Sequence, residues 1–158
     1  MNAHQDRPNT LPWPPLVYLG TVALAVLAHW FWPIPWLPFT IAEFMFAIGW
    51  LVVVLAVAME ISAIRTLRRE KTTVMPHRAS EHLVTGGPFS FTRNPIYLGN
   101  TMLMIGAGLI TGVVWLILFA PVAAFLTQKL AIEREEQHLE ARFGKRYRDY
   151  MKKVRRWI

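Results

Sequence analysis

The sequence predicts an all-α integral membrane protein with four transmembrane helices, the last two forming a helical hairpin, and a C-terminal amphipathic cytoplasmic helix. Three observations support this prediction. Of the 158 residues 54% are hydrophobic, which is more than one small soluble domain can bury. The apolar residues form three long tracts, and the 17 Lys and Arg residues lie outside these tracts or at their ends. Because the chain has no Cys, disulfides and thiolate metal sites are excluded, and we expect no metal.

The first two tracts, residues 16–32 and 41–64, are each long enough for one helical crossing of a bilayer. The connection between them, residues 33–40, carries no basic residue, which places it on the side opposite the basic segments. Four tryptophans flank the first span and fit an interfacial aromatic belt: Trp13, Trp30, Trp32 and Trp36.

The third tract, residues 96–130, is too long for one comfortable crossing and slightly short for two. Basic residues are concentrated both in residues 65–95 and in residues 129–158. The positive-inside rule places both segments in the cytoplasm, so an even number of crossings must separate them. The tract is therefore predicted to be a hairpin with spans at 96–110 and 113–130. Its turn is expected at a group of small residues: Gly106, Gly108, Thr111 and Gly112.

This topology places both termini and a loop at residues 65–95 in the cytoplasm, in a membrane of the bacterial inner type. The net charge of +7 is attributed to an anionic leaflet, so the expected partners are membrane lipids and not nucleic acid. Only His29, Glu43 and Glu60 ionise within the first two tracts, and all three lie near span ends. That scarcity argues against a proton-coupled transporter, although Glu60 could face the interior of the bundle.

The polar segment before residue 96 is unusual for a plain loop. Gly86-Gly87-Pro88 forces a turn, and Asn94-Pro95 is typical of a helix start with Asn as N-cap and Pro in the first turn. Tyr97 then lies within that first turn. The free backbone N–H groups of such a helix start suit an anionic group, whereas the alternative is that these residues form only a turn and a cap.

The C-terminal segment, residues 131–158, has the pattern of an amphipathic helix. Its apolar stripe consists of Leu139, Phe143, Tyr147, Tyr150, Val154 and Trp157. From Arg142 onward there are eight basic residues and a single acid, so we expect this part to lie on the bilayer with its basic face toward lipid phosphates. The acidic pair Glu135-Glu136 at its start could bind an amine or ribose hydroxyls, or could simply be solvated.

Taken together, the two motifs resemble the isoprenylcysteine carboxyl methyltransferase family, and membrane-type phospholipid N-methyltransferases look related. The resemblance covers residues 41–158. Its matching residues are Pro76, Leu83-Val84, Gly87-Pro88-Phe89, Arg93-Asn94-Pro95-x-Tyr97-x-Gly99, and Glu135-Glu136-x-x-Leu139-x-x-x-Phe143-Gly144-x-x-Tyr147-x-x-Tyr150.

This resemblance implies an enzyme that uses S-adenosyl-L-methionine to methylate a lipophilic acceptor arriving from the bilayer, at a carboxylate, an amine or a thiol. The implied cofactor-binding residues are Glu81, His82, Leu83, Val84, Phe89, Asn94, Pro95, Ile96, Tyr97 and Glu135. The backbone of residues 82–84 would address the adenine, Phe89 and Tyr97 would pack against the cofactor, the helix start would hold its carboxylate, and Glu135 its amine or ribose.

No catalytic residue is assigned; Glu60 and Arg134 are candidates, and His77 or His82 could also serve as a base. The sequence departs from the eukaryotic enzymes at Asn94 and Phe89, where His and Tyr are typical, at Ala131, where the family has an Arg, and in its closing residues 154–156. Two alternatives stay open: an NADPH-dependent reductase of the sterol reductase type, which shares a similar Arg-x-Pro-x-Tyr-x-Gly stretch, and a non-catalytic scaffold or transporter.

Overall fold

The structure is a computed structural model that describes residues 13–70 and 83–158. Within these residues every regular element is helical, which confirms the all-α part of the predicted fold class. The elements in order are α1 (Trp13–Phe31), α2 (Phe39–Arg69), a short 3-10 helix η1 (Gly87–Ser90), α3 (Pro95–Thr111), α4 (Val114–Thr127), a π-helical turn η2 (Gln128–Ile132), α5 (Glu133–Phe143) and α6 (Lys145–Lys153).

In the part of the chain that the structure describes, three helical segments are long and apolar enough to cross a membrane: α1, α2 and the continuous run Val114–Phe143 formed by α4, η2 and α5. Helix α3 is also apolar but has only 17 residues. Each of the four predicted spans therefore coincides with a helix. Helix α2 extends to Arg69, so the first five residues of the predicted loop 65–95 belong to it.

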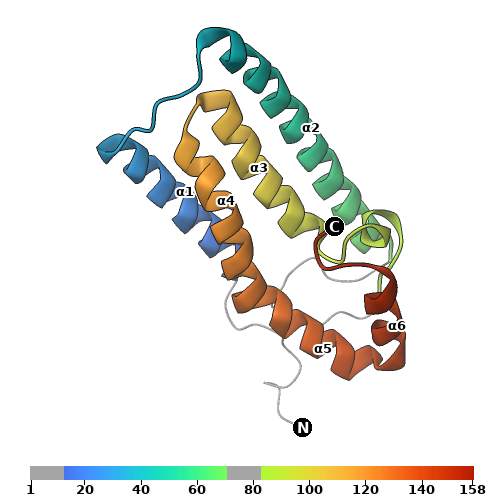
Figure 1. The fold of residues 1–158 in the computed structure, drawn as a ribbon. Helices are drawn as coiled ribbons and strands as arrows, with labels where there is room; N and C mark the ends of the chain where they lie inside the picture. The colour runs from blue at the N-terminus through green and yellow to red at the C-terminus, as the bar shows by residue number, and fades with distance from the viewer. Residues whose placement is uncertain (1–12, 71–82) are drawn as a thin grey trace.

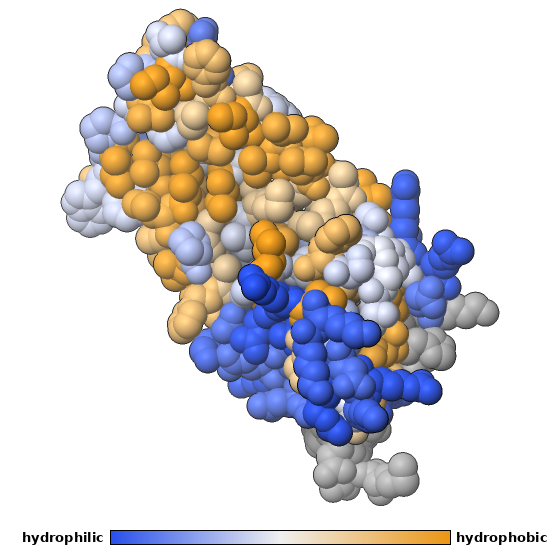
Figure 2. Space-filling model, turned by 45° about the vertical axis from the view of Figure 1, so that its right-hand side comes forward, coloured by the Kyte–Doolittle hydropathy of each residue, from blue (hydrophilic) through white to orange (hydrophobic). Residues whose placement is uncertain are grey.

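The four long helices pack in the order α2, α3, α4, α1, with α3 and α4 forming the hairpin that sequence analysis predicted (Figure 1). Many of the buried residues between them are small, including Ala25, Ala56, Ala120, Ala123 and Gly106, beside the larger Tyr18, Met104 and Leu116. Small residues let helix backbones approach closely. Close packing of this kind drives helix association in a bilayer, because the hydrophobic effect does not favour helix–helix contact over contact with lipid. The large apolar side chains instead cover the outside of the bundle, and the hydrophilic residues gather at one end (Figure 2).

The hairpin turn is tighter than expected. Gly112 and Val113 alone separate α3 from α4, and Gly112 has a φ of 71°, a backbone conformation that favours glycine. Gly106 and Gly108, which were expected to contribute to the turn, lie inside α3 instead. Gly106 faces Gly49 and Val53 of α2, and Gly108 faces the start of α4, so both are helix-packing residues.

The prediction of one continuous helix over residues 131–158 is wrong. Gly144, with φ of 53°, ends α5, after which α6 turns back and the last residues leave the helical conformation. The reason is packing: Tyr147, Tyr150 and Val154 are buried together, with Leu83, Leu139, Phe143 and Met151 around them. The apolar stripe that was expected to enter lipid thus packs against the protein's own polar segment, while the basic side chains of α6 stay exposed.

Candidate functional site

The Asn94-Pro95 helix start has the predicted position but not the predicted side-chain bond. Asn94 is the N-cap of α3 and Pro95 its first residue, and both are buried. The Asn94 amide makes no capping bond; its Nδ2 donates instead to the carbonyl oxygen of Arg156, at 2.9 Å. The backbone N–H groups of Ile96 and Tyr97 are therefore left uncapped by that side chain and are donors that a ligand could use.

Tyr97 and Glu135, both predicted site residues, meet at this helix start. The Tyr97 hydroxyl donates to Glu135 Oε1 at 2.8 Å, although the two residues are 38 positions apart. Glu135 reaches α3 because α4 continues through the π-helical turn η2 into α5, and π-helical turns recur at functional sites. Tyr97 is also held from α1, since the Tyr18 hydroxyl donates to the Tyr97 carbonyl oxygen at 3.0 Å.

The segment before α3 is anchored by α6. Leu83 packs against the buried cluster of Tyr147, Tyr150 and Val154, and the Tyr150 hydroxyl donates to the carbonyl oxygen of Phe89 at 2.6 Å. Burial, followed by the charge of Glu136, raises the pKa of Tyr147 to about 12, so this phenol stays neutral at physiological pH. Burial likewise raises the pKa of Tyr150. Both phenols therefore stay protonated, and Tyr150 remains a donor to the Phe89 carbonyl oxygen.

The remaining predicted site residues are spread more widely. Leu83, Val84 and Phe89 are half-buried, while Glu81 and His82, like the possible base His77, lie outside the described residues. Arg134 is exposed on α5 and does not join the Tyr97–Glu135 pair.

Glu60 lies on α2 against Gly99 of α3: a Cβ built on Gly99 would come within 2.6 Å of Glu60 Oε1. Gly99 follows Tyr97 by two residues, so at 3.6 residues per turn Glu60 sits on a different side of α3 from the pair. Its Oε1 is buried and has no hydrogen-bond partner among the described residues.

A charged cluster beside the pair was not predicted. Glu136 accepts two bonds from Arg156, at 3.0 Å from Nε and 2.6 Å from Nη2, and lies 3.2 Å from Arg93 Nη2. The bond to Glu136 raises the pKa of Arg156, which stays charged. Sequence reasoning assigned Arg156 to the lipid-facing basic residues. The sequence signal that could have identified this cluster is its position next to predicted site residues, since Arg93 precedes Asn94 and Glu136 follows Glu135.

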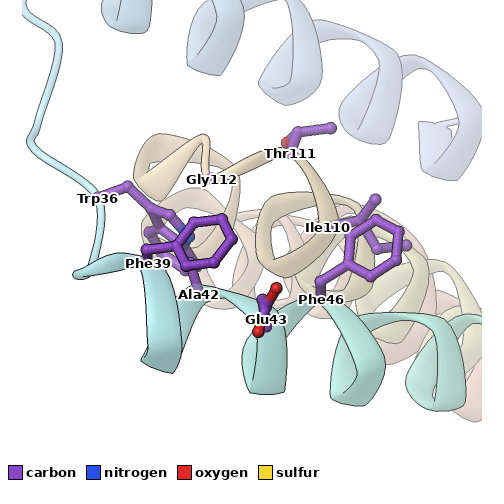
Figure 3. Close-up of a pocket in the computed structure, with 8 residues that line it drawn as sticks. All are labelled: Trp36, Phe39, Ala42, Glu43, Phe46, Ile110, Thr111 and Gly112. Carbon is purple, nitrogen blue, oxygen red and sulfur yellow. The ribbon is translucent and has the colours of Figure 1, made fainter.

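The structure also has a shallow hollow at the opposite end of the bundle, where α2 begins and α3 turns into α4. In Figure 3 the rings of Phe39 and Phe46 stand on either side of Glu43. The other lining residues are Trp36, Ala42, Ile110, Thr111 and Gly112. None of the motif residues contributes to it, so the candidate site remains the α3 start.

Comparison with known proteins finds a matching family model and a similar solved structure. A family model described as phospholipid methyltransferase matches residues 44–146, which include α3 and Glu135. Among solved structures, the eukaryotic intramembrane Ras methyltransferase, isoprenylcysteine carboxyl methyltransferase, is similar, with 25% sequence identity and a TM-score of 0.62. The match covers 92% of this chain and 52% of that one, so the chain spans about half the length of that enzyme. No curated protein matches the sequence significantly. The resemblance drawn from the motifs is thereby confirmed.

Proposed function

We propose that this chain, which belongs to the phospholipid methyltransferase family, transfers a methyl group from S-adenosyl-L-methionine to a lipophilic acceptor at a membrane face. The observation that carries this proposal is the partly buried hydrogen bond between Tyr97 and Glu135 at the start of α3. It joins the two sequence motifs into one site at the polar end of an otherwise apolar bundle.

The residues present fit this cofactor by their donors and acceptors. The amino acid part of S-adenosylmethionine carries a carboxylate and an ammonium group. The uncapped N–H groups of Ile96 and Tyr97 suit the carboxylate, and the Glu135 carboxylate suits the ammonium or the ribose hydroxyls. Backbone groups at Leu83 and Val84, with His82 before them, would address the adenine.

The cofactor supplies an electrophilic methyl group on a sulfonium, so the protein has little acid–base chemistry to perform on the donor side. Its task is to hold the two reactants at reacting distance and to exclude water. The aromatic faces of Phe89 and Tyr97 tolerate the sulfonium charge, a cation–π contact worth about 0.5–2 kcal/mol. Tyr97 is fixed for that role by its bonds to Glu135 and from Tyr18.

The acceptor is proposed to be a lipid-like molecule with a carboxylate, amine or thiol. A carboxylate needs no base, whereas an amine or thiol must lose a proton. Glu60 is the candidate for that role, acting on an acceptor that reaches the first turns of α3 from the α2 side, because its Oε1 is buried and has no hydrogen-bond partner within residues 13–70 and 83–158. Arg134, being exposed, is the weaker candidate.

Glu60→Gln is expected to lower turnover of an amine acceptor by about 100-fold or more, since a positioned base contributes about that factor. Affinity for S-adenosylmethionine should stay at the wild-type value, because Glu60 lies on another side of α3 from Glu135. Steady-state kinetics and calorimetry on the same preparation measure the two effects. Glu43→Gln, a carboxylate on the same helix at the far end of the bundle, is the matched control. Unchanged turnover in Glu60→Gln removes this residue from the mechanism.

The proposed topology has four crossings with both termini in the cytoplasm of a bacterial-type cell, the polar end of the bundle facing that compartment. Helix α3, with 17 residues, is at the lower limit of a crossing helix. The exposed basic side chains of α6 lie at the hydrophilic end visible in Figure 2, where they suit an anionic leaflet.

The decisive experiment is isothermal titration of the detergent-purified protein with S-adenosylmethionine, S-adenosylhomocysteine and NADPH. We expect saturable binding of the two adenosyl ligands and none of NADPH. Binding of NADPH alone would make the protein a reductase of the sterol reductase type. Absence of binding by all three ligands, in protein shown to be folded, would favour a scaffold or transporter.

A further inference from the structure

Residues 154–158, which follow α6, lie across the start of α3 and form a segment that we call the strap. After α6 ends at Lys153 the backbone is extended at Val154, and the chain runs beside the motif residues. The Arg93 backbone N–H donates to the Arg155 carbonyl oxygen at 3.0 Å. The Arg156 carbonyl oxygen accepts from Thr92 Oγ1 at 3.1 Å and from Asn94 Nδ2 at 2.9 Å. Three consecutive residues at the start of α3, Thr92 to Asn94, are therefore bonded to two residues of the strap.

Side chains fix the register of this strap. The Arg156 guanidinium binds both carboxylate oxygens of Glu136, and the same carboxylate pairs with Arg93. Glu136 is only 13% exposed and Arg93 11%, so these two side chains are largely shielded from water, whereas Arg156 is 30% exposed. At the other end, Trp157 Nε1 donates to Gln128 Oε1 at 2.9 Å. The Glu136 carboxylate, which belongs to α5, thus binds both Arg93 of the motif and Arg156 of the strap.

The cluster lies next to the two groups that are proposed to bind the cofactor. Glu136 is the neighbour of Glu135 on α5, and Arg93 precedes Asn94 at the start of α3. The cluster therefore connects the two segments that carry the groups proposed to hold the cofactor, the Glu135 carboxylate and the N–H groups of Ile96 and Tyr97. Bidentate Arg–carboxylate pairs are suited to such a task because their planar geometry fixes orientation as well as distance.

We infer that Arg156 is a positioning residue, which through Glu136 and Arg93 holds the α3 start against α5 so that the cofactor site is formed before the cofactor arrives. This inference rests on the proposed use of S-adenosylmethionine. It concerns binding of the cofactor and not the methyl acceptor, so it predicts a selective kinetic effect. Preformed sites bind more tightly because less ordering remains to be done on binding.

Arg156→Ala is expected to raise the Kd for S-adenosylhomocysteine and the KM for S-adenosylmethionine by about 10-fold or more, since a small misplacement costs up to about 100-fold. The KM for the acceptor should be unchanged. Arg156→Lys keeps the charge but loses the bidentate geometry, so its Kd and KM for the adenosyl ligands should lie between those of the wild type and of Arg156→Ala. The matched control is Arg155→Ala, which removes the same charge from an exposed side chain one residue away.

Hydrogen–deuterium exchange separates positioning from general stability. In Arg156→Ala the amides of residues 92–98 should exchange faster, saturating S-adenosylhomocysteine should restore their protection, and residues 49–57 of α2 should be unaffected. Wild-type affinity in Arg156→Ala would overturn this inference while leaving the proposed function intact. Failure of the wild-type protein to bind either adenosyl ligand would instead overturn the proposed function. If Arg156→Ala does not fold, Arg156→Lys is the deciding variant, and its wild-type Kd would likewise overturn the inference.

Discussion

Glu135→Ala is expected to weaken S-adenosylmethionine binding by roughly 10- to 100-fold while the protein stays folded. A hydrogen bond to a charged group contributes about 1.5–3 kcal/mol, and each 1.4 kcal/mol corresponds to a factor of ten in Kd. Glu135 is the carboxylate that meets Tyr97 at the start of α3, so its loss removes the proposed partner of the cofactor's ammonium or ribose. Calorimetric titration with S-adenosylmethionine and S-adenosylhomocysteine measures the change in Kd.

Two further variants show which group is responsible. Tyr97→Phe removes only the hydroxyl and leaves the Glu135 carboxylate and the aromatic ring, so we expect a loss of only a few-fold. Glu140→Ala removes a carboxylate from the same helix that is 44% exposed and pairs with Arg148, so it should bind like the wild type. If Glu135→Ala and Glu140→Ala bind equally well, Glu135 does not contact the cofactor.

The parts of the site that short sequence motifs identify could be predicted from the sequence. Asn94-Pro95 marks a helix start by backbone preference alone, and Glu135-Glu136 is the only acidic pair just beyond the last apolar tract. Their juxtaposition followed from the hairpin, because two antiparallel helices return the chain to the end where it began. The structure accordingly brings Tyr97 and Glu135 together.

The remaining features depend on contacts that no local pattern encodes. The amphipathic stripe of Tyr147, Tyr150 and Val154 has the same periodicity whether it faces lipid or protein, and only the presence of Leu83 and Phe89 nearby decides between them. The partner of the Asn94 side chain is a carbonyl oxygen 62 residues away. Backbone carbonyls are present at every residue, so such a bond leaves no signature in sequence.

The α2–α3 interface should be highly sensitive to one added methyl group. Gly49 of α2 lies directly against α3: a Cβ at this position would lie 3.0 Å from the Gly106 carbonyl oxygen, 3.0 Å from the Ile110 backbone nitrogen and 2.8 Å from Ile110 Cγ1. Two of these three atoms are backbone, so a change of side-chain rotamer cannot remove the overlap. The helices would have to move apart, which separates the small-residue contacts on which their association depends.

Gly49→Ala is therefore expected to destabilise the protein by about 1–3 kcal/mol, as overpacking does, even though alanine is the better helix former by about 1 kcal/mol. For a chain of this size that corresponds to a decrease in Tm of roughly 2–12 °C. Gly20→Ala is the matched control, because Gly20 lies within α1 and a Cβ there meets nothing within 4 Å. Its Tm should stay equal or rise, so the same substitution should act with opposite sign in two apolar helices. Thermal unfolding in one detergent measures both, and a Gly49→Ala protein as stable as Gly20→Ala would mean that α2 does not pack on α3 this closely.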